Sequence, residues 1–212
     1  MKSRFLIFFL FVIVTLTACA NDKGDENKLS LDDSTRGEKL DDQNVQKEPR
    51  IDSKAEVIDG DFVYRLVSEK SVYAEGGKVE VYAELEYVGD KPEIKIVHAA
   101  SPFSFPMREK TRGYDLLYMM DQPLIVTLLK KGEPLRESFK GAGGYGSEDP
   151  KDYIDFMISV AEASQKGTLP WGDYQVFGFA NFEPIYKESQ ENETLRLKAE
   201  IEFIVEKPEK NG

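Results

Sequence analysis

The stretch "LPWGDYQVFGFANF", residues 169–182, decides the fold that we predict for this chain. Its later part carries bulky side chains on both faces of an extended backbone, which is typical of a central β-strand. Before it, Pro170 and Gly172 flank a single residue and predict a tight turn. Tyr174 and Val176 point to one side of the strand, and we expect that side to face the core.

Alternation of apolar and polar residues predicts six further strands. In "KVEVYAELEYV", residues 78–88, one face is apolar and the other carries glutamates. "TLRLKAEIEFIVE", residues 194–206, has the same period and would be the last strand. The other candidates, separated by turn sequences, are residues 62–70, 92–100, 114–120 and 124–132. Seven short strands, mostly with one wet face, predict two antiparallel sheets packed as a mainly β sandwich.

One helix is predicted between two of these strands, over about residues 150–165. Asp149 is a candidate cap, Pro150 suits the first turn, and Gly167 marks the stop. Apolar residues within the segment follow helical spacing. We expect this inserted helix to cover one end or one edge of the sandwich.

The stretch quoted first resembles the penultimate-strand motif of bacterial immunoglobulin-like domains, P-x-G-x-Y-x-V. The matching positions are Pro170, Gly172, Tyr174 and Val176. This domain type includes the BsuPI-like proteinase inhibitors. The resemblance spans about a dozen residues and implies an immunoglobulin-like antiparallel β-sandwich over residues 61–212. It implies no inhibitory residues, and residues 133–166 are longer than a simple sandwich loop.

The region before residue 61 has a different composition. Residues 20–60 contain no aromatic side chain and carry twelve acidic against seven basic residues. Such a segment buries too little apolar surface to offset the loss of chain entropy on folding. We therefore predict that residues 19–60 form a disordered acidic linker ahead of the sandwich.

The amino end has the layout of an export signal. Lys2 and Arg4 precede the uncharged run "FLIFFLFVIVTL", residues 5–16, and small residues follow. The alternative, a permanent membrane helix, needs about 20 apolar residues, and this run is shorter. The export signal is therefore the preferred interpretation.

The residues that end this segment resemble the lipobox of bacterial lipoproteins. Leu16, Thr17 and Ala18 match its aliphatic and small positions, and Cys19 is the only cysteine in the chain. The resemblance implies that residues 1–18 are removed and that a diacylglycerol is attached to the sulfur of Cys19. The alternative is a buried thiol, but no core-forming pattern surrounds it. A disulfide bond within the chain is excluded because there is no second cysteine to pair with Cys19.

The charge of the chain limits its partners. Its 28 basic and 39 acidic residues give a formal charge of −11, and loss of Lys2 and Arg4 with the signal makes the mature chain more negative. Anionic lipid and nucleic acid would both repel such a protein. We therefore expect the lipid on Cys19 to make the membrane attachment, and we expect no nucleic-acid partner.

Three other segments are candidate sites. "GAGGYG", residues 141–146, matches G-x-G-x-x-G but lacks the strand before it that a dinucleotide site needs, so we expect a loop that displays Tyr145. In "SPFSFPMREK", residues 101–110, Phe103 and Phe105 either form an exposed ridge for a partner or are buried as a cap on the sandwich. His98 is the only histidine, and we expect it to be a structural or a surface residue.

These features predict a lipid-anchored binding or accessory module on the outer face of the cell membrane of a Gram-positive bacterium. Its partner would be an envelope protein or a wall polymer. No catalytic constellation, metal site or cofactor motif is visible, so we expect no enzymatic activity. The alternatives are a small envelope hydrolase with a carboxylate site and a solute-binding lipoprotein of a transporter.

Overall fold

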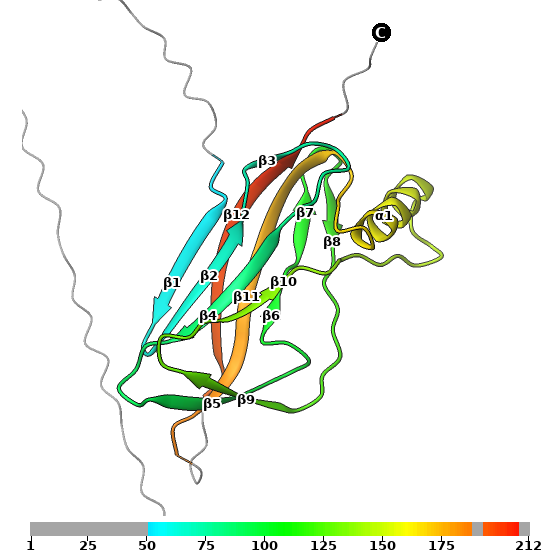
Figure 1. Ribbon diagram of the computed structural model, residues 1–212. Helices are drawn as coiled ribbons and strands as arrows, with labels where there is room; N and C mark the ends of the chain where they lie inside the picture. The colour runs from blue at the N-terminus through cyan, green and yellow to red at the C-terminus, as the bar shows by residue number, and fades with distance from the viewer. Residues whose placement is uncertain (1–50, 188–192, 208–212) are drawn as a thin grey trace, which may run out of the picture. The chain divides into compact units, whose positions relative to one another are not determined.

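The structure is a computed structural model that describes residues 51–187 and 193–207. These residues form two β-sheets that face each other, with one helix beside them (Figure 1). The predicted mainly β sandwich with one inserted helix is confirmed. The membrane-anchor residues Leu16, Thr17, Ala18 and Cys19, and the linker up to residue 50, lie outside the described residues.

The first sheet contains four antiparallel strands. Its order is β1 (Lys54–Asp59), β2 (Phe62–Ser68), β4 (Val81–Tyr87) and β10 (Leu135–Ser138). In β4 the alternation predicted from the sequence is confirmed, because Val81, Ala83, Leu85 and Tyr87 are all buried.

The second sheet is built around the strand predicted to be central. Its main path is β3 (Val72–Tyr73), β12 (Leu195–Val205), β11 (Gly172–Ile185), β5 (Glu93–His98) and β9 (Ile125–Lys130). Three short strands extend it: β6 (Phe103–Ser104) and β7 (Met107–Glu109) pair with β11, and β8 (Tyr114–Leu116) pairs with β7. All these pairs are antiparallel except β3 with β12, which is parallel.

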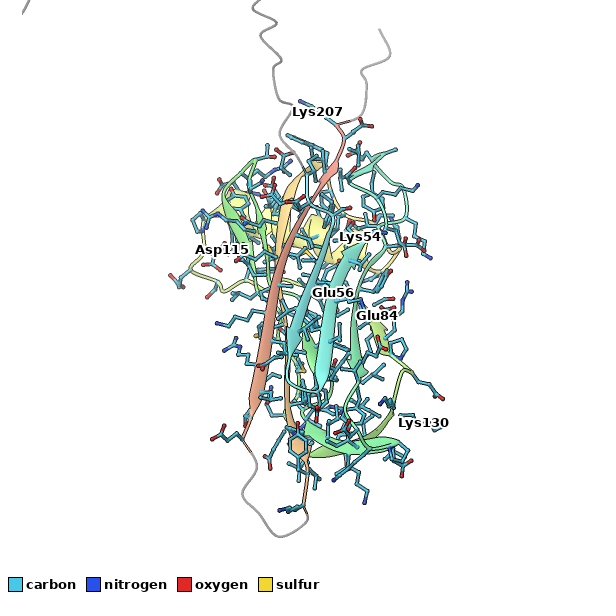
Figure 2. The ribbon with its side chains drawn as sticks, turned by 90° about the vertical axis from the view of Figure 1, so that its left-hand side faces the viewer. Lys54, Glu56, Glu84, Asp115, Lys130 and Lys207 are labelled. Carbon is cyan, nitrogen blue, oxygen red and sulfur yellow. The ribbon has the colours of Figure 1, made fainter. Side chains whose placement is uncertain are left out.

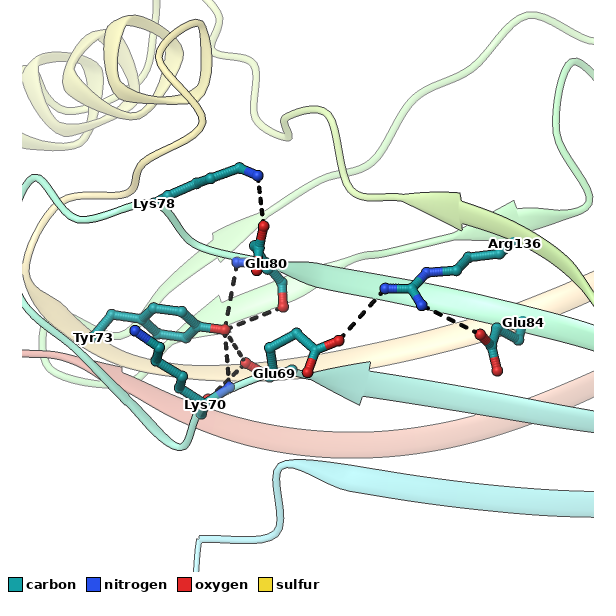
Figure 3. A network of polar contacts seen from close by, with 8 residues as sticks. Glu69, Lys70, Tyr73, Lys78, Glu80, Glu84 and Arg136 are labelled. Carbon is teal, nitrogen blue, oxygen red and sulfur yellow. Dashed lines mark hydrogen bonds and ion pairs between the residues drawn. The ribbon is translucent and has the colours of Figure 1, made fainter.

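The chain passes from the first sheet to the second between β2 and β3. The hydroxyl of Tyr73 lies at this crossing, where it accepts a hydrogen bond from the backbone N–H of Lys70 at 3.2 Å and donates one to the carbonyl of Glu80 at 3.1 Å (Figure 3). It also lies 2.9 Å from the hydroxyl of Ser68. One side chain of β3 therefore ties the end of β2 to the residue that precedes β4.

The turn before β11 is a tyrosine corner. Tyr174 is fully buried, and its hydroxyl donates a 2.7 Å hydrogen bond to the carbonyl of Pro170, four residues upstream. Such a corner at the start of the penultimate strand is a hallmark of immunoglobulin-like sandwiches. Gly172 has a positive φ of 156°, and a Cβ there would lie 2.5 Å from Oε1 of Glu109, so the turn requires glycine. This geometry explains the Pro-x-Gly-x-Tyr pattern of the sequence.

The helix α1 (Lys151–Ser164) lies between β10 and β11 in the chain and packs Phe156, Met157 and Val160 into the core. Its predicted bounds are confirmed, but the predicted cap is wrong. The helix has no side-chain cap, because the carboxylate of Asp149 accepts a hydrogen bond from the backbone N–H of Gly146 instead. Gly167 follows the helix with a φ of 71°, as a helix stop requires.

The predicted boundary at residue 60 is wrong, because β1 belongs to the sandwich. All six of its residues pair with β2, and Arg65 of β2 contacts Glu56 of β1 at 2.6 Å. Only Ala55 and Val57 of β1 pack partly against the core. An edge strand with so little apolar surface resembles a polar linker in composition, so its sequence did not reveal it.

The first and last described residues of the chain lie at one end of the sandwich, and strands β5 and β9 lie at the other (Figures 1 and 2). The start of β1 near Lys54 and the end of the described chain near Lys207 lie at the same end, and Lys130 at the end of β9 lies at the other (Figure 2). Strands β5 and β9 also lie at this second end (Figure 1).

Candidate ligand-binding groove

A long hairpin in the second sheet opens in its middle. At one end β7 pairs with β8, where Met107 lies opposite Leu116, and at the other end β5 pairs with β9, where His98 lies opposite Ile125. Between these two ladders, residues 99–106 and 117–124 separate into two arms. The arms remain linked where the backbone N–H of Ala100 donates to the carbonyl of Asp121 at 3.2 Å. An interrupted hairpin of this kind leaves a hollow beside β11.

The hollow is a pocket of about 290 Å³, which we call the central pocket. The two arms supply Ser101, Ser104, Tyr118 and Gln122 among its lining residues. Its floor and far wall are Phe179 and Asn181 of β11 and Arg196 of β12. The pocket therefore combines one cation, the aromatic rings of Tyr118 and Phe179, and several neutral hydrogen-bonding groups.

Two further pockets adjoin the central pocket. One, of about 300 Å³, shares Phe179 and Arg196 with it and adds Phe177 and Lys198. The other, of about 220 Å³, shares Gln122 and Asn181 with it and lies at the β5–β9 end. We call the three pockets together the outer groove. It follows the outward residues of β11, which alternate with the buried ones that form the core.

Arg196 lies at the junction of two of these pockets. Its guanidinium carbon is 4.1 Å from the centroid of the Phe179 ring. Within the described ranges its guanidinium group makes no ion pair and no hydrogen bond to another side chain. Stacking on the ring fixes the position of the charge but leaves its N–H donors free for a ligand.

The neutral groups of the central pocket are also available. Burial raises the pKa of the Tyr118 phenol above its ordinary value, so this phenol is protonated at neutral pH. The Ser101 hydroxyl accepts a 2.9 Å hydrogen bond from the backbone N–H of Phe103 and retains its own O–H as a donor. The pocket therefore presents donors to a ligand.

Of the two alternatives predicted for Phe103 and Phe105, exposure as a ridge is wrong and burial is confirmed. Their exposed fractions are 0% and 1%. Phe103 stacks on Tyr64 across the sandwich, and Phe105 packs edge-on against Tyr118 and Phe139. The cause is that β6 pairs with β11 and turns Phe103 into the core, whereas its neighbour Ser104 faces the groove.

Tyr145 has an exposed fraction of 53%, so the expected display of this ring is confirmed. The loop around it is held by its backbone, because the N–H of Gly143 donates to the carbonyl of Leu117 at 2.7 Å. A Cβ at Gly143 would lie 2.0 Å from the terminal methyl of Met157, so this glycine serves close packing on the helix. Tyr145 does not line the outer groove.

His98 lines the pocket at the β5–β9 end of the groove, and both of its ring nitrogens lie within hydrogen-bond distance of a partner. Nδ1 is 2.8 Å from the carbonyl oxygen of Ala99, and Nε2 is 2.7 Å from the hydroxyl of Thr127. The ring thus ties β5 to β9, which agrees with the structural role expected for it.

Among the described residues Glu109 is the only carboxylate that is buried. It accepts backbone N–H bonds from Thr111 and Arg112, both at 2.8 Å, and pairs with the Arg112 guanidinium at 3.3 Å. Its role is to hold the turn after β7. Over the described ranges no group of three or more potential metal ligands is found, and no described helix is long and apolar enough to cross a bilayer.

The sequence contained one signal for the groove that we interpreted differently. Phe177 and Phe179 made β11 bulky on both faces, and we took this only as typical of a central strand, which β11 is. The structure shows that these rings line the groove and that Asn181 lies directly opposite Arg196. Outward aromatic residues beside a basic residue on the neighbouring strand are the pattern that could have revealed it.

Comparisons with known proteins add no family. No protein-family model and no curated protein matches the chain. Among solved structures, a protein from Archaeoglobus fulgidus resembles it with a TM-score of 0.31 and 9% sequence identity, over 75% of this chain and 100% of that one. A likeness at this level carries no argument about function.

Proposed function

We propose that this protein is a lipid-anchored binding module of the cell envelope that holds a wall polymer in the outer groove. The observation that carries the proposal is the groove itself, with Arg196, which has no ion pair among the described residues, stacked on Phe179 at its centre. Binding sites are concave, largely preformed, and combine apolar surface with a few placed polar groups. The outer groove meets this description.

The extended form of the groove favours a linear ligand over a compact one. It follows outward residues of β11 from Phe177 to Glu183. At about 3.4 Å per residue this is a length of about 20 Å. The backbone groups of β11 are already paired with its neighbours, so an added peptide strand cannot dock on them. Recognition therefore depends on side chains.

The described part of the molecule is compatible with attachment through Cys19. The described chain enters at the Lys54 end, and the β5–β9 end of the groove lies at the opposite end (Figures 1 and 2). Anchoring at Cys19, location on the outer face of the membrane and a Gram-positive source remain predictions from the sequence.

The alternative activities are less well supported by the groove. A hydrolase of the glycosidase type needs two carboxyl groups flanking the scissile bond. The outer groove contains Glu183 and Glu200, but in different pockets. The solute-binding alternative rests on the sequence alone. Both stay predictions.

The proposal is tested by titrating the isotope-labelled lipidated chain, held in detergent micelles, with an enzymatic digest of purified cell wall. We expect NMR chemical-shift changes at Phe177, Phe179 and Asn181. Tyr145, which is exposed but outside the groove, should not shift. Changes confined to the Tyr145 loop, or no change anywhere, would contradict the proposal.

A further inference from the structure

Among the described residues Arg112, Arg136 and Arg196 each lie over an aromatic ring, and the two exposed ones, Arg136 and Arg196, form a natural comparison. Arg136 of β10 lies 3.3 Å from the ring centroid of Tyr82. Its guanidinium is also within 3.5 Å of Glu69 and 3.6 Å of Glu84, so two carboxylates balance its charge (Figure 3). Arg196 has the same stacked geometry on the other sheet without such a carboxylate among the described residues.

This difference is informative because the chain is rich in acids. Arg65, Arg108, Arg112 and Arg136 all form ion pairs, which leaves Arg196 as the exception among the described arginines. A guanidinium with free donors matches a planar carboxylate, which it can bind through two parallel hydrogen bonds. Lys198, on the next outward position of β12, lines the adjoining pocket together with Glu200, so these two residues add no net charge and Arg196 supplies the positive charge of the site.

The other residues that line the groove indicate what else the ligand contains besides a carboxylate. Ser101, Gln122 and Asn181 line the central pocket with hydroxyl and amide groups, which suit a ligand with several hydroxyls. Phe177, partly exposed in the adjoining pocket, offers an apolar surface. A sugar ring has both hydroxyl edges and C–H faces. We infer that the outer groove binds a linear glycan whose sugars carry carboxylates, and that Arg196 pairs with one of these carboxylates.

This inference rests on the proposed function and adds the class of ligand to it. The overall negative charge of the protein opposes long-range attraction of an acidic polymer. Recognition must therefore come from short-range contact with Arg196. Affinity should depend on salt only weakly, as expected for about one ion pair.

The defining experiment compares two probes that differ only in charge. The lipidated chain in detergent is titrated by calorimetry with an oligogalacturonate and with its methyl ester, which keeps the sugar chain and removes the carboxylate charge. We expect the acid to bind about tenfold more tightly than the ester, as a charge-assisted hydrogen-bond pair predicts. Arg196→Gln should abolish this preference, and Arg136→Gln, the matched control, should retain it.

Several outcomes would overturn the inference. The ester could bind as tightly as the acid, or Arg136→Gln could remove the preference as fully as Arg196→Gln. A tetraglutamate peptide that competes as well as the oligogalacturonate would identify an acidic peptide as the ligand class. Thermal unfolding of both variants checks that they are folded. If the wall digest shifts the NMR signals of the groove but the acid and the ester bind equally, the inference is wrong and the proposed function stands. A digest that does not bind contradicts both.

Discussion

Two buried tyrosines show how a single hydroxyl can have opposite effects in one core. The hydroxyl of Tyr174 makes the tyrosine corner with Pro170. The hydroxyl of Tyr64 is buried and has no hydrogen-bond partner within the described residues. A buried polar group that forms a hydrogen bond stabilises the fold modestly, and one left without a partner costs desolvation free energy.

We therefore predict opposite results for the two removals. Tyr174→Phe should lower the free energy of unfolding by about 1 kcal/mol, because it leaves the carbonyl of Pro170 without this donor. Tyr64→Phe should leave it unchanged or raise it by about 1 kcal/mol, because it removes an unsatisfied hydroxyl. Urea unfolding measures both, with Tyr145→Phe as the exposed control. Equal destabilisation by the two core variants would contradict this account.

The same tyrosines make stability depend on alkaline pH. Burial raises the pKa of both Tyr64 and Tyr174 far above the ordinary value near 10. Above that pH the unfolded chain loses phenolic protons that the folded chain keeps, so the free energy of unfolding falls as pH rises. Each of the two groups contributes a slope of at most about 1.4 kcal/mol per pH unit.

The measurement is urea unfolding between pH 8 and pH 11. We expect the wild-type stability to be constant up to about pH 10 and then to fall. The double variant Tyr64→Phe/Tyr174→Phe should show a shallower fall above pH 10. A fall as steep as that of the wild type would place the titrating groups elsewhere.

At the scale of the elements, periodicity predicted the long strands and missed the short ones. All seven predicted strands exist, although the one expected over residues 114–120 ends at Leu116. The missed strands are β1, β3, β6, β7 and β10, and four of these five have four residues or fewer. Two to four residues contain too few alternations to show a period. These strands are specified by the partner strand they pair with, which a local pattern cannot reveal.

The open hairpin was hidden for a related reason. Residues 101–110 attracted notice for Phe103 and Phe105, but nothing in the composition of residues 99–106 and 117–124 shows that they separate, because the separation follows from how the two ladders around them align. The groove therefore depends on pairing between distant strands. Its aromatic floor was visible in the sequence, but its walls were not.

The role of β1 leads to a prediction for truncation. A chain that begins at residue 61 lacks β1, so the edge of β2 loses all six of its residue pairs with that strand. We expect its free energy of unfolding to be lower by several kcal/mol, at about 1 kcal/mol per lost hydrogen bond. A chain that begins at residue 51 keeps β1 and serves as the control. Equal thermal midpoints for the two truncated chains would show that β1 is dispensable.

At the scale of the whole molecule, the amino end and the sandwich have separate roles in this account. Residues 16–19 would set the location, and the outer groove would set what is bound. The sequence predicted the location without the structure, because a lipobox is a contiguous motif. The binding surface combines residues from the two hairpin arms, β11 and β12, which are far apart in the chain. Only the fold brings them together.

The anchor is tested by Cys19→Ser in the producing cell. We expect the variant to be released from the membrane fraction or to remain as the uncleaved precursor, and labelled palmitate should not enter it. Wild-type protein, labelled and retained in the membrane, is the control. Palmitate incorporation into the variant would contradict lipidation at Cys19.

The most direct test of the central claim places a photoreactive benzophenone side chain at Phe177, in the groove, or at Tyr145, which is exposed outside it. Irradiation of living cells that carry each version of the lipidated protein is followed by mass analysis of the adducts. The account predicts cross-links to wall glycan from position 177 and none from position 145. Cross-links from position 145 alone, or no glycan adduct from position 177, would contradict it.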